Sequence, residues 1–333
     1  MAKINILSPV ASGNGACVIH AMLEENIRNY NLVPYNPYLT LFPPSLYFTG
    51  RTKRADVIHT TPDYAIFHAR KSVPLILTFH GYVLDEYMSK YSNLLQSIHY
   101  KTNLLYQTKK ALPKAKIITA VSRFIANIVS KDLDQDIKIR TIYNGIDENR
   151  FIPRRVGKIN NSKNIKVLIA GHVSVKKGSR WINDIIENLD QRISISYTTG
   201  LTSSRKQLMH PRLTCLGSIP YSEMPSLYQK FDILLFPTVR EGFGLVAAEA
   251  MSCGLPVVAT DCSSLPELVI HEKGGYLCKL GDVADFADKL NLLAENPSLR
   301  GEMGVFNREI VEQKFTLSRM IRNYEEVFEE AVS

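Results

Sequence analysis

Two glutamates, Glu241 and Glu249, lie eight residues apart in the segment 236–256, where a predicted buried strand runs through a glycine-rich loop into a helix. Gly242 and Gly244 let the backbone approach a ligand closely, and amide groups at a helix start can bind an anion. Carboxylates do not suit phosphate, but they accept hydrogen bonds from sugar and ribose hydroxyls. The pattern favours a site for a phosphorylated sugar, although spacing alone leaves open a surface-loop Glu241 and a solvated Glu249.

A second candidate segment, 171–178, follows a predicted strand and contains Lys177 directly before a glycine. A lysine at this position can stabilise a leaving diphosphate, because parallel sheets bind their ligands at the carboxyl ends of the strands. Composition alone leaves the alternative of a basic surface loop open.

The N-terminal half offers two weaker signals. Gly13 and Gly15 follow the first predicted strand and would let the backbone approach a diphosphate, although an ordinary turn explains them equally well. His80 follows the predicted strand 75–79, where a single histidine is either structural or a ligand contact.

Asp132, Asp134 and Asp136 form two Asp-x-Asp triplets, which metal-dependent transferases of another fold use for manganese. Here they precede the predicted strand 139–142, which is the wrong end of a parallel strand for a ligand. We interpret them as a solvated acidic loop, and we predict no metal and no cofactor.

These segments need a scaffold, which the apolar pattern predicts. Short β-branched and aliphatic runs alternate with longer amphipathic stretches such as 87–112, and this alternation is typical of parallel sheets with helices on both faces. The predicted strands are Lys3–Val10, Val57–His59, Leu75–Phe79, Ile117–Val121, Ile139–Ile142, Ile165–Ala170, Ile193–Tyr197, Ile233–Pro237 and Pro256–Thr260. Helices are expected at 283–297 and 306–330, with Thr316 or Ser318 as a cap of the second.

The division into domains follows from length and composition. A chain of 333 residues favours two domains of about 150 residues over a single core. The polar, basic stretch 151–164 has the composition of a linker. We therefore expect one domain at 1–150, a second at 165–315, and a C-terminal helix at 316–333 that packs back on the first domain.

Charge and composition limit the function classes. The chain carries 40 Lys and Arg against 32 Asp and Glu, and residues 1–150 hold 18 basic against 11 acidic residues, which suggests an acidic partner. Five cysteines without a Cys-x-x-Cys pair fit the reduced thiols of a cytosolic protein. No signal peptide is apparent, and no apolar run approaches the roughly 20 residues that span a bilayer. We expect a cytoplasmic protein, soluble or peripheral on a membrane.

The segment Tyr87–Lys116 combines apolar residues at helical spacing with six lysines. The favoured interpretation is a helix packed on the core with a solvated basic face. The alternative is an interfacial helix that binds an anionic membrane surface.

The segment around the two glutamates strongly resembles the donor-site signature of retaining GT-B glycosyltransferases, glycosyltransferase family 4. The resemblance covers roughly residues 117–330 and is most specific at 236–267. Other similar stretches are Tyr143–Asp147, Phe151–Pro153, Leu216–Tyr221, Leu227–Asp232 and Gly274–Asp282. The family implies an α/β fold of GT-B architecture, with two Rossmann-like doubly wound parallel-sheet domains facing a cleft: 1–150 on the acceptor side and 165–315 binding the nucleotide sugar.

The resemblance also implies roles for individual residues. Glu249 would hold the donor ribose, Glu241 would contact sugar hydroxyls near the reacting centre, and His80 would reach the donor sugar. Lys177 matches the family's lysine, whereas His172 stands where the family usually has arginine, so Arg180 or Lys176 would substitute for it. The remaining donor-binding positions are Gly13, Gly15, Ser218, Ile219, Phe243, Gly244 and Leu245.

The function expected from the resemblance is transfer of a hexosyl residue, with retention, from a UDP- or GDP-linked sugar to an acceptor hydroxyl. The acceptor would be a glycan, a lipid-linked saccharide or a glycolipid. Front-face attack is favoured because no carboxylate nucleophile is apparent beneath the anomeric carbon. The alternatives are a sugar-nucleotide epimerase or phosphorylase of similar fold, and a basic nucleic-acid-binding protein. The latter is disfavoured because basic and aromatic residues are not interleaved on a sheet face, so we expect no nucleic-acid partner.

Overall fold

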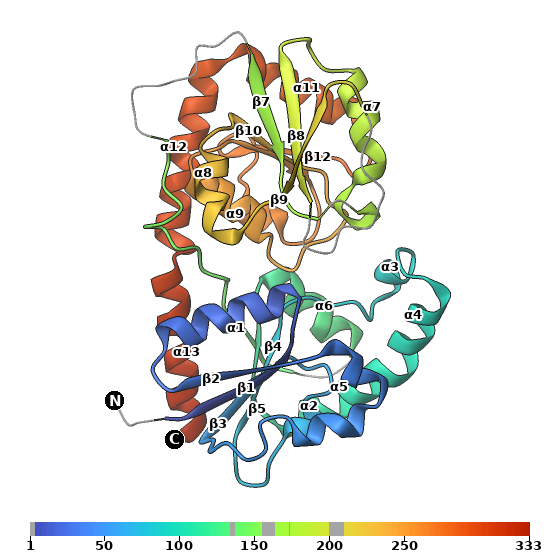
Figure 1. The fold of residues 1–333 in the computed structure, drawn as a ribbon, viewed down its shortest axis with the longest axis vertical. Helices are drawn as coiled ribbons and strands as arrows, with labels where there is room; N and C mark the ends of the chain where they lie inside the picture. The colour runs from blue at the N-terminus through green and yellow to red at the C-terminus, as the bar shows by residue number, and fades with distance from the viewer. Residues whose placement is uncertain (1–3, 134–136, 155–163, 173, 200–209) are drawn as a thin grey trace. The chain divides into compact units, whose positions relative to one another are not determined.

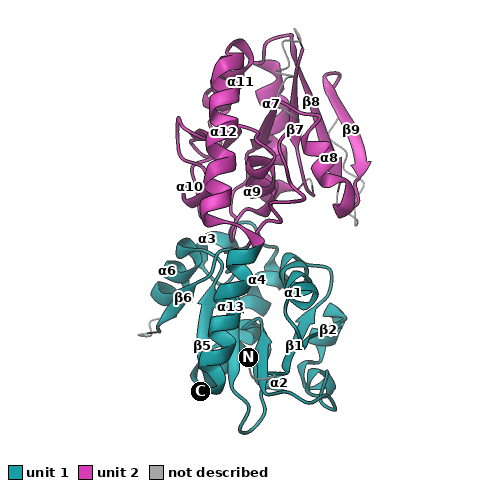
Figure 2. Ribbon diagram, turned by 90° about the vertical axis from the view of Figure 1, so that its left-hand side faces the viewer, with its two compact units in different colours: residues 1–144, 318–333 teal, residues 145–317 magenta. Residues whose placement is uncertain are grey.

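The structure is a computed structural model that describes residues 4–133, 137–154, 164–172, 174–199 and 210–333. The chain divides into two compact units, shown in different colours in Figure 2. Unit 1 comprises residues 1–144 and 318–333, and unit 2 comprises residues 145–317. Most of the expected linker, 155–163, lies outside the described residues, as do Asp134 and Asp136.

Unit 1 is built on a six-stranded sheet in the order β2-β1-β3-β4-β5-β6, and every strand pair in it is parallel (Figure 1). Its strands are β1 (Ile6–Ala11), β2 (Tyr30–Tyr35), β3 (Val57–Thr60), β4 (Leu75–Phe79), β5 (Ala115–Ala120) and β6 (Ile139–Thr141). Ile58 of β3 pairs with Leu7 of β1 and with Leu75 of β4, and all three side chains are buried. Burial on both faces explains the continuous apolar runs of these central strands.

The helices of unit 1 include α13, which comes from the far end of the chain. They are α1 (Gly15–Asn26), α2 (Ala65–His68), α3 (Glu86–Ser89), α4 (Leu94–His99), α5 (Leu105–Ala111), α6 (Arg123–Asp132) and α13 (Leu317–Val332). Short 3₁₀ turns are η1 (Pro37–Leu41), η2 (Pro43–Phe48) and η4 (Leu112–Lys114), and η3 (Tyr100–Leu104) is a π-helical turn. Helix α13 belongs to unit 1 because its Tyr324 and Phe328 rings lie 5.2 and 5.4 Å from the ring of His59 in β3.

Unit 2 repeats the same plan. Its parallel sheet has the order β12-β11-β10-β7-β8-β9, and its core lies where Phe286 and Leu290 of one helix pack on strand residues such as Val258. The strands are β7 (Ile165–Ile169), β8 (Ile193–Thr199), β9 (Leu213–Ser218), β10 (Ile233–Phe236), β11 (Val257–Thr260) and β12 (Gly275–Cys278). The helices are α7 (Ile182–Glu187), α8 (Met224–Tyr228), α9 (Leu245–Ser252), α10 (Leu265–Leu268), α11 (Val283–Glu295) and α12 (Pro297–Lys314), with 3₁₀ turns η5 (Val175–Lys177), η6 (Ser179–Trp181) and η7 (Tyr221–Glu223).

Both sheets have a switch point in their strand order. In unit 2 the chain runs outward from β7 to β8 and β9, and it then returns to β10 on the other side of β7. In unit 1 the corresponding reversal lies between β1 and β3. Open parallel sheets bind ligands at the carboxyl ends of the strands beside such a reversal. The predicted fold class, two Rossmann-like doubly wound domains, is confirmed.

The nine predicted strands are present, and the three that the sequence analysis missed are β2, β9 and β12. All three are edge strands. Edge strands need not be buried on both faces, so they lack a continuous apolar signal. Strand β2 also contains Pro34, which a sheet tolerates at its edge.

The predicted helix at 306–330 is wrong, because the chain forms α12 and α13 with a break at Phe315 and Thr316. At the break, the Phe315 carbonyl accepts a hydrogen bond from the Ile146 amide, and the Leu317 amide donates to the Ile146 carbonyl. These bonds to a distant segment replace the bonds of a continuous helix.

The interpretation of Tyr87–Lys116 as one core-packed helix is also wrong. The segment is interrupted by Asn93, whose side chain caps α4, and by the π-helical turn before α5. Leu94, Leu95 and Ile98 are exposed to solvent instead of packing on the core. Among the described residues, no helix has both the length and the apolar character needed to cross a membrane.

Candidate functional site

In unit 2, Glu241 and Lys177 form an ion pair at the carboxyl ends of the neighbouring strands β10 and β7. Glu241 Oε1 also accepts a hydrogen bond from Thr238 Oγ1 at 2.9 Å, and the Glu241 amide donates to Ser263 Oγ at 2.9 Å. The Glu241 side chain is 12% exposed, and Lys177 Nζ lies 5.1 Å from the centre of the Phe236 ring. Two residues predicted for the site from separate motifs are therefore in direct contact.

The loops that carry these two residues are joined along their backbones. The Val239 amide donates to the Lys176 carbonyl at 2.9 Å, and Thr238 Oγ1 lies 3.1 Å from the same carbonyl oxygen. Gly178 has a φ of +77°, and a Cβ atom at this position would collide with the carbonyl oxygen of Pro237. The close approach of the two loops therefore requires glycine at position 178.

The other end of the β7 loop lies beside the start of α9. A Cβ atom at Gly171 would contact the Val246 side chain at 3.8 Å, and Gly171, His172 and Lys177 line one small recess with Phe236. His172 is exposed. The Lys177 ammonium group and the free amides at the amino end of α9 are a favourable environment for an anion.

Glu249 is buried in the second turn of α9, so the alternative of a solvated helix face is wrong. Tyr228 Oη donates a hydrogen bond to Glu249 Oε2 at 2.8 Å. Burial raises the pKa of Glu249 to about 7, while hydrogen bonds from Tyr228 and Tyr221 and the charge of Arg150 act in the opposite direction. This carboxyl group therefore changes its charge close to neutral pH.

The remaining donor-binding candidates of unit 2 lie in the loop before α9, at its first residue and after β9. Phe243 is buried against Phe315, with ring centres 5.7 Å apart, and its carbonyl accepts a hydrogen bond from Ser264 Oγ at 2.9 Å. Gly244, with a φ of +100°, precedes the first residue of α9, Leu245. Ser218 is exposed at the end of β9, and Ile219 lies two residues before Tyr221.

Gly13 and Gly15, in unit 1, lie between β1 and α1. Gly13 has a φ of +79°, and a Cβ atom at either glycine would have no neighbour within 4 Å. Asn14 between them caps α1, because its side chain accepts a hydrogen bond from the Cys17 amide at 2.9 Å. The amide end of α1 is therefore exposed at the carboxyl end of β1.

His80, also in unit 1, belongs to a buried histidine cluster instead of being a single histidine. Its Nε2 lies 3.1 Å from Nε2 of His20 in α1, and its buried Nδ1 has no hydrogen-bond partner among the described residues. His20 Nδ1 lies 2.6 Å from Ser8 Oγ and 2.7 Å from Tyr30 Oη. Burial lowers the pKa of His80 to about 3, so its ring is neutral at physiological pH.

The cluster continues through His59 in β3. Tyr30 Oη lies 2.8 Å from His59 Nδ1, and His59 Nε2 lies 2.7 Å from Thr78 Oγ1. Burial lowers the pKa values of His20 and His59 well below their ordinary range, with a further contribution from repulsion within the cluster. The result is a chain of neutral, hydrogen-bonded side chains that ends at the unpaired nitrogen of His80.

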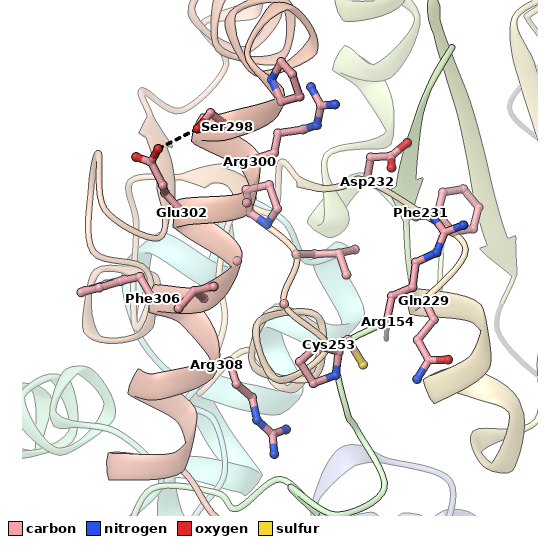
Figure 3. Close-up of a pocket in the computed structure, with 18 of the residues that line it drawn as sticks. Arg154, Gln229, Phe231, Asp232, Cys253, Ser298, Arg300, Glu302, Phe306 and Arg308 are labelled. Atoms are coloured by element: carbon pink, nitrogen blue, oxygen red, sulfur yellow. Dashed lines mark hydrogen bonds between the residues drawn. The ribbon is translucent and has the colours of Figure 1, made fainter. Parts of the chain in front are cut away.

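A large groove in unit 2 lies at the opposite end of the sheet from Glu241. It has a volume of about 880 Å³ and lies between α12, which contributes Glu302 and Phe306, and the segment containing Phe231 and Asp232 (Figure 3). Asp232 directly precedes β10, so the groove lies at the amino ends of the strands. None of the predicted site residues lines it.

The sequence analysis missed several polar partners in the two units. Tyr228 and Tyr221 were included in a similar stretch without a role, and His20 was not identified. His59 lies in the predicted strand that pairs directly with β1, and His80 follows the next strand of the sheet, β4. Two histidines at neighbouring strand ends are a signal that could have predicted the cluster.

Comparisons with known families divide the chain in the same way. Residues 143–309 match the family of glycosyl transferases group 1, and residues 13–150 match glycosyltransferase family 4. An uncharacterized glycosyltransferase of Methanocaldococcus jannaschii is 30% identical over 80% of this chain and 71% of its own length. N-acetyl-alpha-D-glucosaminyl L-malate synthase of Bacillus anthracis is 24% identical over 92% of this chain and 82% of its own.

Solved structures share the whole fold at lower identity. HepE of Anabaena, solved in complex with UDP and glucose, has a TM-score of 0.80 at 19% identity and covers 98% of this chain and 99% of its own. Sucrose-phosphate synthase of Thermosynechococcus elongatus has a TM-score of 0.82 at 16% identity, with 98% of each chain covered. These likenesses show a common architecture for both units.

Proposed function

Because this chain belongs to the group 1 glycosyltransferases of glycosyltransferase family 4, with the GT-B fold, we propose that it transfers a hexosyl residue from a UDP- or GDP-linked sugar to an acceptor hydroxyl with retention. The transferase activity itself follows from the family. The donor, the stereochemistry and the acceptor are the parts that we propose here.

The proposal is carried by one observation: two carboxylates in a single loop–helix segment have different environments. Glu241 forms an ion pair with Lys177, whereas Glu249 is buried and hydrogen-bonded to Tyr228, and its burial raises its pKa to about 7. An ionised carboxylate suits sugar hydroxyls, and a buried one suits the pair of ribose hydroxyls of a nucleotide. The complex of HepE with UDP and glucose supports the same class of donor.

In the proposed reaction the bond between the anomeric carbon and the diphosphate oxygen breaks, and the acceptor oxygen bonds to that carbon on the same face. The acceptor proton passes to the leaving phosphate oxygen, so the step needs no further reactant. Lys177 and the first amides of α9 would stabilise the charge that develops on the diphosphate. His80, whose ring is neutral, would contact a hydroxyl of the donor sugar. The proposed acceptor is a glycan, a lipid-linked saccharide or a glycolipid.

The test is calorimetric titration of UDP, GDP and ADP into the wild type, Glu249→Ala and Glu309→Ala. We expect one of the first two nucleotides to bind and Glu249→Ala to weaken it about 10- to 100-fold, the effect of losing hydrogen bonds to a charged group. Glu309 lines the groove at the opposite end of the sheet, so Glu309→Ala should bind normally. Equal affinity in all three proteins would refute the assignment of Glu249.

The stereochemistry requires a separate measurement. Once the donor is known, NMR of the product formed with a simple acceptor should show the anomeric configuration of the donor. An inverted product would overturn the retaining assignment while leaving the transferase activity intact.

A further inference from the structure

In the described part of the chain, the most exposed large apolar side chains are concentrated in two short segments of unit 1. Among the described residues, six large apolar side chains are more than 65% exposed, and their exposures range from 67% to 81%. They are Tyr38, Leu41, Phe42, Phe48, Leu94 and Leu95. Such a concentration favours an interaction site, because soluble proteins rarely expose many large apolar side chains close together.

The first segment is an ordered part of the fold. Prolines begin both of its 3₁₀ turns, and Asn36 caps the first by accepting a hydrogen bond from the Tyr38 amide. Leu46 is fully buried, and Arg70 donates hydrogen bonds to the carbonyls of Gly50 and Lys53. The exposed aromatic side chains of this segment are therefore carried by turns that are fixed to the rest of unit 1.

The second segment is supported by the same small core. Leu46 from η2 and Leu104 from the π-helical turn belong to one buried cluster with Tyr35 and Tyr64, and α2 packs against both η2 and α5. In Figure 1, α2 and α5 lie side by side in unit 1. Residues 37–48 and 94–106 are therefore anchored to the same small buried cluster.

The charge around these segments is mainly positive. Residues 26–131 contain 14 Lys and Arg but only four Asp and Glu, a balance of +10, whereas the whole chain has +8. No acidic residue occurs at 26–55 or at 87–131. Lys53, Arg54 and Lys101 are exposed, and the Arg51 guanidinium lies 4.2 Å from the centre of the Tyr47 ring. Aromatic rings with basic side chains beside them are typical of the water–lipid boundary.

We propose that these residues form a docking surface for an anionic membrane. The surface, called here the apolar–basic surface, consists of Tyr38, Leu41, Phe42, Phe48, Leu94 and Leu95 with Arg51, Lys53, Arg54 and Lys101. Its apolar side chains enter the boundary between headgroups and acyl chains, and its basic side chains bind lipid phosphates. The surface would hold the enzyme beside lipid-linked acceptors, but it does not depend on the identity of the donor.

Other occupants fit the surface less well. A second copy of this chain would present the same positive charge, and the two surfaces would repel each other. A nucleic acid would pair with the basic residues, but the aliphatic side chains of Leu41, Leu94 and Leu95 cannot stack on bases. An anionic lipid layer accommodates both the charge and the aliphatic groups.

The test is co-sedimentation with vesicles of phosphatidylcholine alone, or of phosphatidylcholine and phosphatidylglycerol in about equal amounts. The wild type should pellet with the anionic vesicles at low salt, less at high salt, and not with the neutral vesicles. Lys53→Glu should lower the membrane affinity about fivefold or more, because it removes a basic residue. The double variant Leu41→Ser/Phe42→Ser should also lower the affinity, because it removes apolar side chains that would enter the lipid layer. Matched controls in unit 2 are Lys230→Glu and Val305→Ser, which change exposed residues and should bind as the wild type does.

Folding and nucleotide binding are measured on the same variants. All should melt with the wild type and bind nucleoside diphosphate as it does, because these positions are exposed and none is among the residues assigned to the donor site. Failure of the wild type to pellet with anionic vesicles, or equal binding by all variants, would overturn the membrane proposal while leaving the donor proposal untouched. A wild-type dimer that Leu41→Ser/Phe42→Ser dissociates would likewise overturn it, in favour of a protein interface.

Discussion

His20 Nε2 and His80 Nε2 lie 3.1 Å apart, and this contact links α1 to the residue that follows β4. Two neutral ring nitrogens at this distance form a hydrogen bond only when one carries a proton and the other does not. The tautomer of His20 therefore determines the tautomer of His80, and with it whether the free Nδ1 of His80 donates or accepts. Ser8 and Tyr30 act on the same choice through His20 Nδ1.

We predict that His20→Ala lowers turnover about tenfold, because His80 then loses its only hydrogen-bond partner among the described residues. His20→Gln should recover part of the loss, since an amide can replace the imidazole nitrogen. The affinity for plain nucleoside diphosphate should not change. The control is His68→Gln, which alters a buried histidine outside the cluster. A parallel loss of turnover in His20→Gln and His68→Gln would indicate a general packing effect.

Nucleotide affinity should rise with pH through about 7. The pKa of Glu249 is raised to about 7 by burial, and ribose hydroxyls would bind best to its ionised form. Affinity at about pH 6 should therefore be about tenfold lower than at pH 8, and Glu249→Gln should remove this dependence. Calorimetry at several pH values measures it. A flat profile for the wild type would exclude Glu249 from the nucleotide contact.

When it is ionised, the Glu249 carboxyl group should lower the free energy of unfolding of the protein without nucleotide. Its folded-state pKa of about 7 lies above the ordinary value of 4.5, so the folded state binds more protons between these values, and stability falls as pH rises through this window. Above pH 7, Glu249→Gln should raise the free energy of unfolding by at most about 3 kcal/mol. Chemical denaturation near pH 4 and pH 8 makes the comparison, and an equal effect of the mutation at both would contradict it.

Lys177→Met and Glu241→Gln should lower turnover more than nucleotide affinity. Removing a charge-stabilising group typically costs about 10²–10³ in turnover, and Lys177→Arg should retain part of the activity. Because the two side chains are ion-paired, the double mutant should lose less than the product of the single losses. Independent, multiplicative losses would mean that the pair does not act as a unit.

Gly178→Ala should destabilise the protein and weaken donor binding, because the new methyl group would separate the loops that carry Lys177 and Thr238. The matched control is Gly217→Ala. Gly217 has a similar φ of +74°, but a Cβ atom there meets no neighbour within 4 Å, so this variant bears only the backbone cost of about 1 kcal/mol. Thermal melting of both variants makes the comparison. Equal decreases in melting temperature would argue against a collision between the new Cβ atom at position 178 and the Pro237 carbonyl.

His172 can be tested by comparing His172→Arg and His172→Ala. The exposed imidazole of His172 stands where the family has arginine, so His172→Arg should keep or raise turnover, because arginine is permanently charged. His172→Ala should be impaired at neutral pH. Equal turnover of the wild type and both variants at saturating donor would assign the role to Lys177 and the helix amides alone.

The sequence was sufficient for features that depend on local pattern. The strand, glycine loop and helix around Glu241 and Glu249 lie within one continuous segment, so the start of α9 at Leu245 and its end before Gly254 were predicted correctly. The partners of these residues were not predictable in the same way. Tyr228 precedes Glu249 by 21 residues, and His20 precedes His80 by 60, so both contacts depend on strand order instead of spacing.

The failures have the same physical origin. Helix propensity at 306–330 runs without interruption, but the break at Phe315 is imposed by hydrogen bonds to Ile146, 169 residues earlier. The apolar spacing of Leu94 and Leu95 suggests a buried stripe, yet no element covers these side chains in the described part of the chain. Periodicity shows that a face is apolar, but it does not show what lies against it.

The placement of α13 in unit 1 has a consequence for the order of folding during synthesis. Residues 1–144 leave the ribosome first, but Tyr324 and Phe328, which cover His59 and Tyr30, are made only after the whole of unit 2. The core of unit 1 therefore stays incomplete until α13 has been synthesised. A nascent chain that ends before residue 317 would contain nearly all of unit 2, but unit 1 would lack α13 and expose part of its core. Chaperones would be needed to protect that exposed core.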